Sequence, residues 1–151
     1  MMTQTASLPT LFGRFTIVSG EHQRLSTTLR QLGEMCLALE AGNGEHSPDS
    51  HPLQLLAALH LTLRRHFATE EAEGYFGAVA GERPSLLPSI AGLRAQHTAM
   101  LQTTAELAAI SADERRWAEL SAPTLCLIER LQAHERAESL LLRDFFAPAE
   151  A

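Results

Sequence analysis

The chain has 151 residues, of which 45% are apolar and 20% charged, and a formal net charge of −6 at pH 7. This length and composition predict one globular domain, residues 1–151, with a single substantial core, and they exclude a disordered chain. No apolar run reaches the roughly 18 residues that a membrane-spanning helix needs, and an acidic chain without a basic cluster is not expected to bind nucleic acid.

A first amphipathic helix is predicted over residues 14–41, after an N-terminal arm, residues 1–13, that we expect to be flexible. Its apolar positions step by three and four residues, which marks one buried face. The segment AGNG at its end is a helix stop signal. The buried face carries Val18, His22, Leu25, Leu29, Leu32, Cys36 and Leu39.

The second predicted helix covers residues 51–77. The segment GNGEHSPDSHP before it has the composition of a loop, in which Asp49 or Ser50 can cap a helix that tolerates Pro52 in its first turn. Two glycines and a proline in GAVAGERPS then stop the helix. Its inward face carries Leu56, Leu59, Leu63, His66 and Glu70, with Phe67 beside them.

A third helix is predicted over residues 85–110, and a fourth forms the end of the chain. Between them, Ser111 with Glu114 resembles a capping box. Pro123 either kinks the last segment or lies in the first turn of its main helix, with Ser121 as the cap. The inward faces carry Leu86, Ile90, Leu93, His97, Leu101, Thr104 and Ala108 on the third helix, and Leu127, Leu131, His134, Glu138, Leu141 and Phe145 on the fourth.

Four amphipathic helices joined by short or moderate loops predict an all-α fold, an antiparallel up-down-up-down four-helix bundle. In such a bundle the ends of neighbouring helices coincide. His22 lies about 8 residues from the start of its helix and Glu70 about 7 from the end of its own, each roughly 11–12 Å from the same end of the bundle. His97, His134 and Glu138 lie at a similar depth, so all of these groups are expected to meet at one level.

The spacing of histidine and glutamate points to a metal site. His66 and Glu70 are four residues apart, as are His134 and Glu138, and this spacing lets each pair present a nitrogen and an oxygen to one point. Burying such groups is costly unless they are paired or bind a metal. Four imidazoles and two carboxylates suit iron or manganese, or zinc, and two bridging carboxylates would hold two metal ions. The predicted metal ligands are His22, His66, Glu70, His97, His134 and Glu138.

The motifs around these residues are EHQRL at His22, HFATEE from His66 to Glu71, LRAQHTAML at His97, and AHERAESLL at His134 and Glu138. In this ordered pattern, which covers most of the chain, the protein resembles the hemerythrin-like HHE cation-binding domains, which are non-haem di-iron four-helix bundles. The resemblance implies that the four histidines are terminal ligands of two iron ions and that Glu70 and Glu138 bridge them.

Two positions differ from the oxygen-carrying hemerythrins. Those proteins have another histidine one turn after the first on helix three, where this chain has Leu101, and their last carboxylate is an aspartate at a spacing of five, where Glu138 comes at four. By the resemblance, each iron would have five ligands and one free position. The set is similar to that of the bacterial iron-centre repair proteins, whose family roles involve nitric oxide and oxidative stress.

Other polar residues lie close to the predicted site. His60 is expected to pack at the rim rather than to bind metal or support a ligand. Glu71 and Glu73 are expected on a solvated face, from which either could hydrogen-bond a ligand imidazole and orient it. Tyr75 is expected to cap the end of the bundle rather than to donate to the site.

The remaining histidines and the cysteines are assigned no function. His46 and His51 are expected to be solvated in a polar loop at the opposite end of the bundle. Cys36 and Cys126 form no CxxC motif and are expected to be buried free thiols. The N-terminal residues lack the basic start and apolar middle of a secretory signal, and we expect a cytoplasmic protein.

Three functional classes remain open from the sequence. The first is a non-enzymatic di-iron protein that binds or senses O2 or NO, or handles iron. The second is a di-iron redox enzyme or an iron-centre repair factor that acts on NO, O2 or peroxide. The third is a metal-free helical interaction module. In the first two classes zinc or manganese could replace iron.

Overall fold

The computed structural model describes residues 8–42, 51–72 and 76–146, and for residues 8–20 and 146 it describes the backbone alone. This part of the chain is all-helical and contains no strand. It comprises α1 (Leu8–Glu40), α2 (Pro52–Glu71), α3 (Phe76–Glu82), α4 (Leu87–Ser111) and α5 (Ser121–Phe146), with two 3-10 turns, η2 (Pro84–Leu86) and η3 (Glu114–Glu119).

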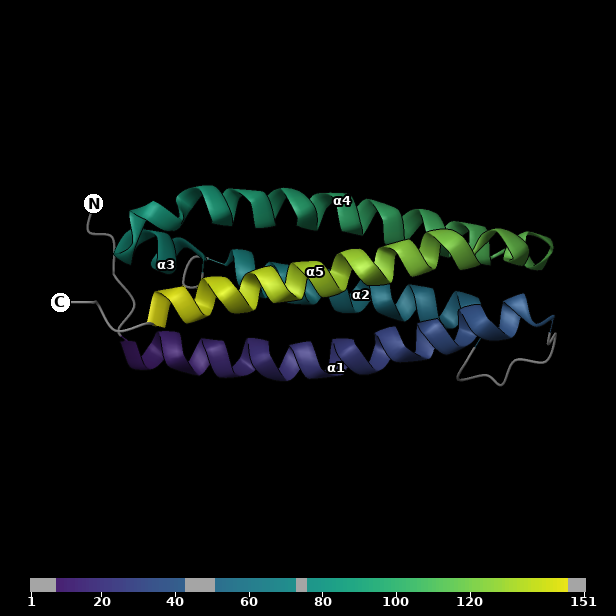
Figure 1. Ribbon diagram of the computed structural model, residues 1–151, viewed down its shortest axis with the longest axis horizontal. Coiled ribbons are helices and arrows are strands. Elements are labelled where there is room, and N and C mark those ends of the chain that lie inside the picture. Colours follow the sequence, from purple (N-terminus) through teal and green to yellow (C-terminus); the bar gives the residue numbers. More distant parts are fainter. Residues whose placement is uncertain (1–7, 43–50, 73–75, 147–151) are drawn as a thin grey trace.

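The four long helices lie side by side along the long axis of the molecule, and the short α3 lies at one end (Figure 1). Helix α1 packs against α2 and α5, and α4 packs against the same two helices. This arrangement is compatible with a four-helix bundle. Within the described residues, none of the helices has the length and apolar content that crossing a membrane requires.

Two apolar clusters fill the interior. The larger cluster joins all four long helices through residues such as Leu32, Leu59, Leu107 and Leu131. The smaller cluster joins α3 to parts of α4 and α5 and consists of Phe76, Val79, Ile90, Leu93, Leu141, Leu142 and Phe145. Along α4 and α5, the histidines and the glutamate of the predicted site fall between the residues of the two clusters. A buried polar layer therefore separates two apolar regions.

The helix boundaries differ from the predicted ones at three places. Helix α1 begins at Leu8, so it includes residues 8–13 that the sequence assigned to a flexible arm; Pro9 is compatible with the first turn of a helix. Helix α2 ends at Glu71, earlier than predicted. The predicted break after α2 contains α3, because burial of Phe76 and Val79 in the smaller cluster compensates for its glycines.

The turns agree with the sequence only in part. Gly42 after α1 has a φ of 72°, the left-handed conformation typical of a helix stop. Pro52 lies in the first turn of α2, as predicted, whereas Asp49 and Ser50 lie outside the described residues. The capping box is wrong: Ser111 belongs to α4, and Asp113 accepts a hydrogen bond from the backbone N–H of Arg115 at the start of η3.

A hydrogen bond connects the start of α5 to the end of α1. Pro123 lies in the first turn of α5, as in one of the two predicted alternatives, but Ser121, the predicted cap, is the first residue of the helix. The Ser121 hydroxyl donates a hydrogen bond to Oε1 of Glu40 at the last residue of α1, over 2.8 Å. Cys36 on α1 is buried, as predicted, but the prediction for Cys126 is wrong, because this residue precedes the buried Leu127 on α5 and faces solvent.

Candidate metal centre

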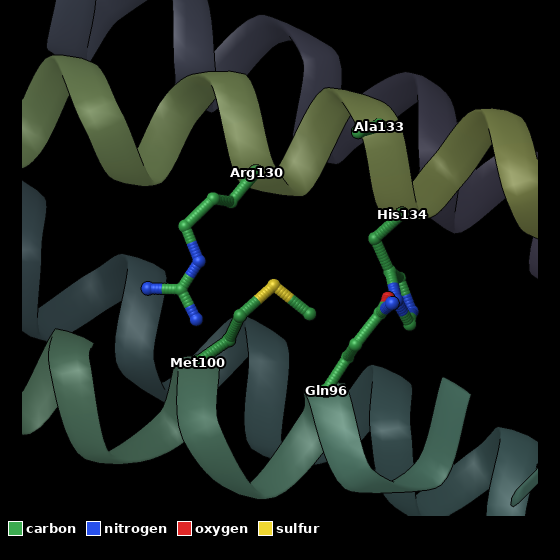
Figure 2. Close-up of a pocket in the computed structure, with 5 residues that line it drawn as sticks. All are labelled: Gln96, Met100, Arg130, Ala133 and His134. Atoms are coloured by element: carbon green, nitrogen blue, oxygen red, sulfur yellow. The ribbon is translucent and has the colours of Figure 1, made fainter. Parts of the chain in front are cut away.

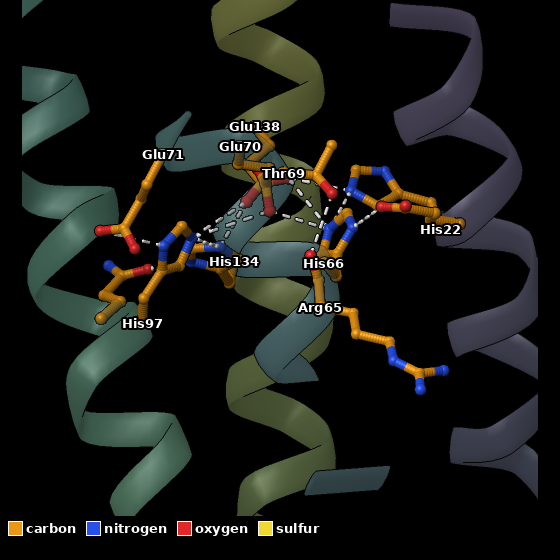
Figure 3. Close-up of polar contacts among 11 residues, drawn as sticks. His22, Arg65, His66, Thr69, Glu70, Glu71, His97, His134 and Glu138 are labelled. Carbon is orange, nitrogen blue, oxygen red and sulfur yellow. Dashed lines mark hydrogen bonds and ion pairs between the residues drawn. The ribbon is translucent and has the colours of Figure 1, made fainter. Parts of the chain in front are cut away.

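All six predicted ligands lie together at one level of the molecule (Figure 3). His22 comes from α1, His97 from α4, and one histidine–glutamate pair comes from each of α2 and α5. The view shows His22 and His66 on one side, His97 and His134 on the other, and the two glutamates between them. The residues are His22, His66, Glu70, His97, His134 and Glu138, and all are buried except His22, which is half-buried.

These side chains form two overlapping groups of potential metal donors. The first group contains His22 and His66 with both glutamates, and the second contains His97 and His134 with the same two glutamates. Within each group the candidate donor atoms lie within 4.8 Å of one another. Because Glu70 and Glu138 belong to both groups, their carboxylates are placed where they could serve two ions at once.

The first group is compact. Nε2 of His22 lies 3.1 Å from Nε2 of His66 and 2.9 Å from Oε2 of Glu138. Nε2 of His66 lies 2.8 Å from Oε1 of Glu70, one helical turn further along α2. Three helices thus supply four donors that converge on one point.

The second group repeats this geometry on the other side of the glutamates. Nε2 of His97 lies 3.1 Å from Nε2 of His134, which lies 2.5 Å from Oε1 of Glu138, one turn further along α5. Nε2 of His97 is also 3.7 Å from Oε1 of Glu70 and 3.6 Å from Oε1 of Glu138. Two nitrogens and two oxygens again face one point.

The outer nitrogens of two histidines are fixed by neighbouring helices. Nδ1–H of His66 donates to Oε2 of Glu21 on α1 over 2.5 Å, and Nδ1–H of His134 donates to Oε1 of Gln96 on α4 over 2.6 Å. In its neutral form an imidazole carries one N–H, so this hydrogen bond leaves the Nε2 lone pair of each neutral histidine facing the glutamates. Such an outer hydrogen bond is typical of metal-binding histidines.

With both imidazoles neutral and both carboxyl groups ionised, lone pairs would face lone pairs in the centre. Nε2 of His134 lies 2.5 Å from Oε1 of Glu138, and Nε2 of His66 lies 2.8 Å from Oε1 of Glu70. Both oxygens of Glu70 and Oε1 of Glu138 are among the described buried atoms without a hydrogen-bond donor. Either a proton or a metal cation between the atoms relieves this repulsion. The donor set, with imidazole nitrogens and carboxylate oxygens, fits iron, manganese or zinc.

The two carboxyl groups differ in protonation. Burial, together with the nearby Glu138 carboxylate, raises the pKa of Glu70 to about 12. Burial also acts on Glu138, but the surrounding imidazoles outweigh it and hold the pKa of Glu138 well below its usual range. Without metal, one proton therefore stays on Glu70 while Glu138 is ionised. Two adjacent buried carboxyl groups commonly share a proton in this way.

Two aromatic rings hold the imidazoles of the second group in position. The ring of Phe67 stacks on that of His97 at 3.9 Å between centroids and 7° between planes, and it meets His134 edge-on at 5.6 Å. Phe76 lies 5.9 Å from His97 in a second stacked contact. These contacts leave His97 little freedom to rotate, which preserves the direction of its Nε2 lone pair.

Other residues discussed in the sequence analysis lie outside the two donor groups. His60 lies outside both donor groups, and its ring hydrogen-bonds with the Thr104 hydroxyl over 2.7 Å, which agrees with the expected rim position. Leu101 packs against the larger apolar cluster. Glu71 is exposed, as expected, and its Oε1 lies 3.7 Å from Nδ1 of His97. His51 is half-buried rather than solvated, with its ring edge-on to Trp117 at 5.0 Å.

Three residues assigned from the sequence, His46, Glu73 and Tyr75, lie outside the described residues. Conversely, the sequence analysis missed Glu21 and Gln96, the two partners of the outer histidine nitrogens. A signal for them exists in the sequence, because each directly precedes one of the two lone inward histidines.

Two hollows reach the histidines from the surface. One of about 220 Å³ lies between α4 and α5, with Met100 and Arg130 on opposite walls and Gln96 and His134 at one end (Figure 2). Another of about 690 Å³ extends along α5 to His22. Its lining consists of His22, Gln132, Glu135, Arg136, Ser139, Leu140 and Arg143. Each hollow therefore borders one histidine of a donor group, His134 in the first case and His22 in the second.

Comparison of the chain with protein-family models, curated proteins and solved structures found no match.

Proposed function

We propose that this protein is an antiparallel up-down-up-down four-helix bundle of the hemerythrin-like type that binds two metal ions, with iron as the resident metal. His22 and His66 would hold one ion, His97 and His134 the other, and Glu70 and Glu138 would bridge the two. In Figure 1 the sequence colours advance in opposite directions from each long helix to the next along the chain. This order supports the antiparallel topology.

One observation carries the metal proposal. Four imidazoles and two carboxylates converge in one largely buried layer, and the outer hydrogen bonds of His66 and His134 direct their Nε2 atoms to the centre. Such a layer is costly to bury unless cations neutralise it. If this layer were purely structural, apolar side chains would cost less free energy to bury. Apolar side chains do form the two clusters that lie on either side of the layer.

The function that this site supports best is the binding or sensing of O2 or NO, or the handling of iron, rather than conversion of an organic substrate. When bound, the iron pair would supply the redox-active centre to which a diatomic molecule attaches. The chain's own residues fix the imidazoles through Glu21, Gln96 and Phe67 and surround the centre with apolar clusters.

A redox or iron-centre repair role acting on NO, O2 or peroxide is the second candidate. It is favoured by the hollow of about 690 Å³ that reaches His22, and by Leu101, which supplies no donor where oxygen carriers have a further histidine. Reversible, stoichiometric gas binding by the iron-loaded protein would support the first role. Turnover with an added reductant would support the second.

The decisive experiment is anaerobic reconstitution with Fe²⁺, followed by metal analysis and by optical spectra before and after air, azide and nitric oxide. About two irons per chain are expected, since two carboxylates can bridge a metal pair, with spectra that change on addition of the small ligands. A folded chain with all six residues intact that binds no Fe²⁺, Mn²⁺ or Zn²⁺ would overturn the proposal and favour a metal-free helical module.

A further inference from the structure

The two halves of the centre have matching geometry. The histidine nitrogens face each other at 3.1 Å in both halves, in His22 with His66 and in His97 with His134. In both, the histidine of the His-x-x-x-Glu pair donates its outer N–H to the residue that directly precedes the lone histidine on the adjacent helix, over 2.5 Å in one half and 2.6 Å in the other.

The acceptors of these two outer hydrogen bonds differ in charge. The acceptor for His66 is the carboxylate of Glu21, whereas the acceptor for His134 is the amide oxygen of Gln96. Glutamate and glutamine have nearly the same shape, so the geometry is retained while the charge differs by one unit. The difference lies on the same hydrogen-bonded nitrogen in each half and therefore acts on equivalent metal-facing lone pairs.

A carboxylate and an amide affect an imidazole differently. A carboxylate attracts the Nδ1 proton more strongly, which pushes electron density toward Nε2 and makes it a better donor to a cation. The extra negative charge also lowers the energy of a cation nearby. We infer, on the basis of the proposed di-metal function, that Glu21 makes the half with His22 and His66 the high-affinity metal position, and that the half with Gln96 binds its ion more weakly.

Glu71 does not restore the symmetry. Its Oε1 lies 3.7 Å from Nδ1 of His97, beyond hydrogen-bonding distance, and its side chain is 41% exposed. Glu21 makes a direct hydrogen bond and is 23% exposed. Because solvent screens an exposed charge, the carboxylate of Glu71 acts on its histidine much less than that of Glu21 does.

The consequence is an order of loading. The first metal ion occupies the half with Glu21, and the second enters beside Gln96, where the 220 Å³ hollow reaches His134. The second ion is the one that exchanges more readily. Glu21 and Gln96 act through the histidines, so they are positioning residues rather than ligands.

The test is a titration of the metal-free protein with Co²⁺, whose absorption reports ligation. Two separate binding steps are expected for the unaltered chain. Glu21→Gln, which copies the acceptor of the other half, should weaken the first step about 10- to 100-fold, the usual effect of losing such a partner. Gln96→Glu should strengthen the second binding step, so that the affinities of the two steps become similar. Glu34→Gln on the exposed face of α1 changes the net charge equally and should alter neither step.

Variants with one half disabled identify which step belongs to which half. With His97→Ala the remaining Co²⁺ should bind at the tighter affinity, and with His22→Ala at the weaker one. Adding Glu21→Gln should then weaken binding in the first background only. Helical circular dichroism and urea unfolding confirm that each variant folds.

The outcomes separate this inference from the proposed function. Two Co²⁺ per chain with affinities unaffected by Glu21→Gln and Gln96→Glu would overturn the unequal halves and leave the di-metal proposal standing. A chain that binds no Co²⁺ and no Fe²⁺ would overturn both. Tighter binding in the His22→Ala variant than in the His97→Ala variant would also contradict the assigned order.

Discussion

Oε1 of Glu138 lies between two imidazoles, 2.5 Å from Nε2 of His134 and 3.6 Å from Nε2 of His97, while its Oε2 lies 2.9 Å from Nε2 of His22 in the other half. One carboxylate thus faces both candidate metal positions with different oxygens. This is the arrangement that a bridging ligand needs, and it makes the two glutamates unlike the four histidines in their expected effect on metal content.

Substitution of a bridging glutamate should abolish the binding of both metal ions. Glu70→Ala and Glu138→Ala are expected to reduce iron from about two per chain to nearly none, whereas His97→Ala keeps about one, because a histidine serves a single ion. Iron analysis after anaerobic reconstitution measures this. His60→Ala, which removes a nearby histidine outside both donor groups, is the control and should keep both ions. Equal losses in the glutamate and histidine variants would contradict the bridging assignment.

The metal-free protein should lose stability as pH rises. Burial raises the folded-state pKa of Glu70 to about 12, so the folded chain keeps a proton that the unfolded chain releases. The resulting stabilisation is complete below the usual glutamate pKa and declines as pH rises from there toward 12, by up to about 1.4 kcal/mol per pH unit.

Urea unfolding at pH 5.5, 7 and 8.5 tests this dependence. In the metal-free protein, Glu70→Gln should raise the free energy of unfolding at pH 8.5 by about 1–3 kcal/mol and flatten the profile, since the amide has no proton to lose. The same substitution should impair metal binding. Parallel profiles for the original and substituted chains would show that Glu70 does not hold this proton.

Phe67 should be important for both stability and the centre. Its ring is buried and stacks on His97, so Phe67→Ala is expected to lower the free energy of unfolding by about 3–5 kcal/mol. Phe67→Leu keeps most of the volume and should cost less than about 1.5 kcal/mol. Denaturant unfolding of both metal-free variants gives the values. A loss below about 1 kcal/mol for the alanine variant would mean that the site collapses around the gap.

Removal of metal should loosen one end of the molecule. The polar layer joins the smaller cluster of α3, α4 and α5 to the rest of the bundle, so chelation should speed amide exchange around Phe76, Val79 and Leu142. Exchange around Leu32 and Leu59 in the larger cluster should change little. Hydrogen exchange with and without iron makes the comparison. Uniform acceleration along all helices would instead indicate global destabilisation.

The two thiols should differ in reactivity. Burial raises the pKa of the Cys36 thiol, whereas Cys126 is exposed on α5. A thiol reagent should therefore modify one cysteine per folded chain at once and the second only after unfolding. Cys126→Ser should remove the rapid phase, and Cys36→Ser should leave it. A rapid phase that persists in the Cys126→Ser variant would contradict the burial of Cys36.

Periodicity carried most of what could be predicted about the fold. The apolar steps of three and four residues predicted the four long helices and the inward faces from which the six side chains meet. The predicted depths of His22 and Glu70 along their helices were wrong, because α1 begins at Leu8 and α2 ends at Glu71. That these residues bind metal stays a prediction. Helix α3 was missed because its glycines signal a break, whereas contacts of Phe76 and Val79 with distant residues stabilise the helix.

The parts of the site that sequence analysis missed depend on how neighbouring helices are rotated. Glu21 reaches His66 from α1, and Gln96 reaches His134 from α4, in contacts between residues 45 and 38 positions apart. Periodicity gives the inward face of one helix but not the rotation of its neighbour. The same uncertainty explains Cys126, since one position along α5 moves a side chain by about 100° around the axis.

The division of the interior into two apolar clusters bears on how the protein is made in the cell. The larger cluster draws on all four long helices and contains none of the six donors. Under the proposed di-metal function, a newly synthesised chain is therefore expected to acquire its shape through leucine and methionine packing before it binds metal. Maturation would then be a separate step, in which metal enters a protein that is already folded.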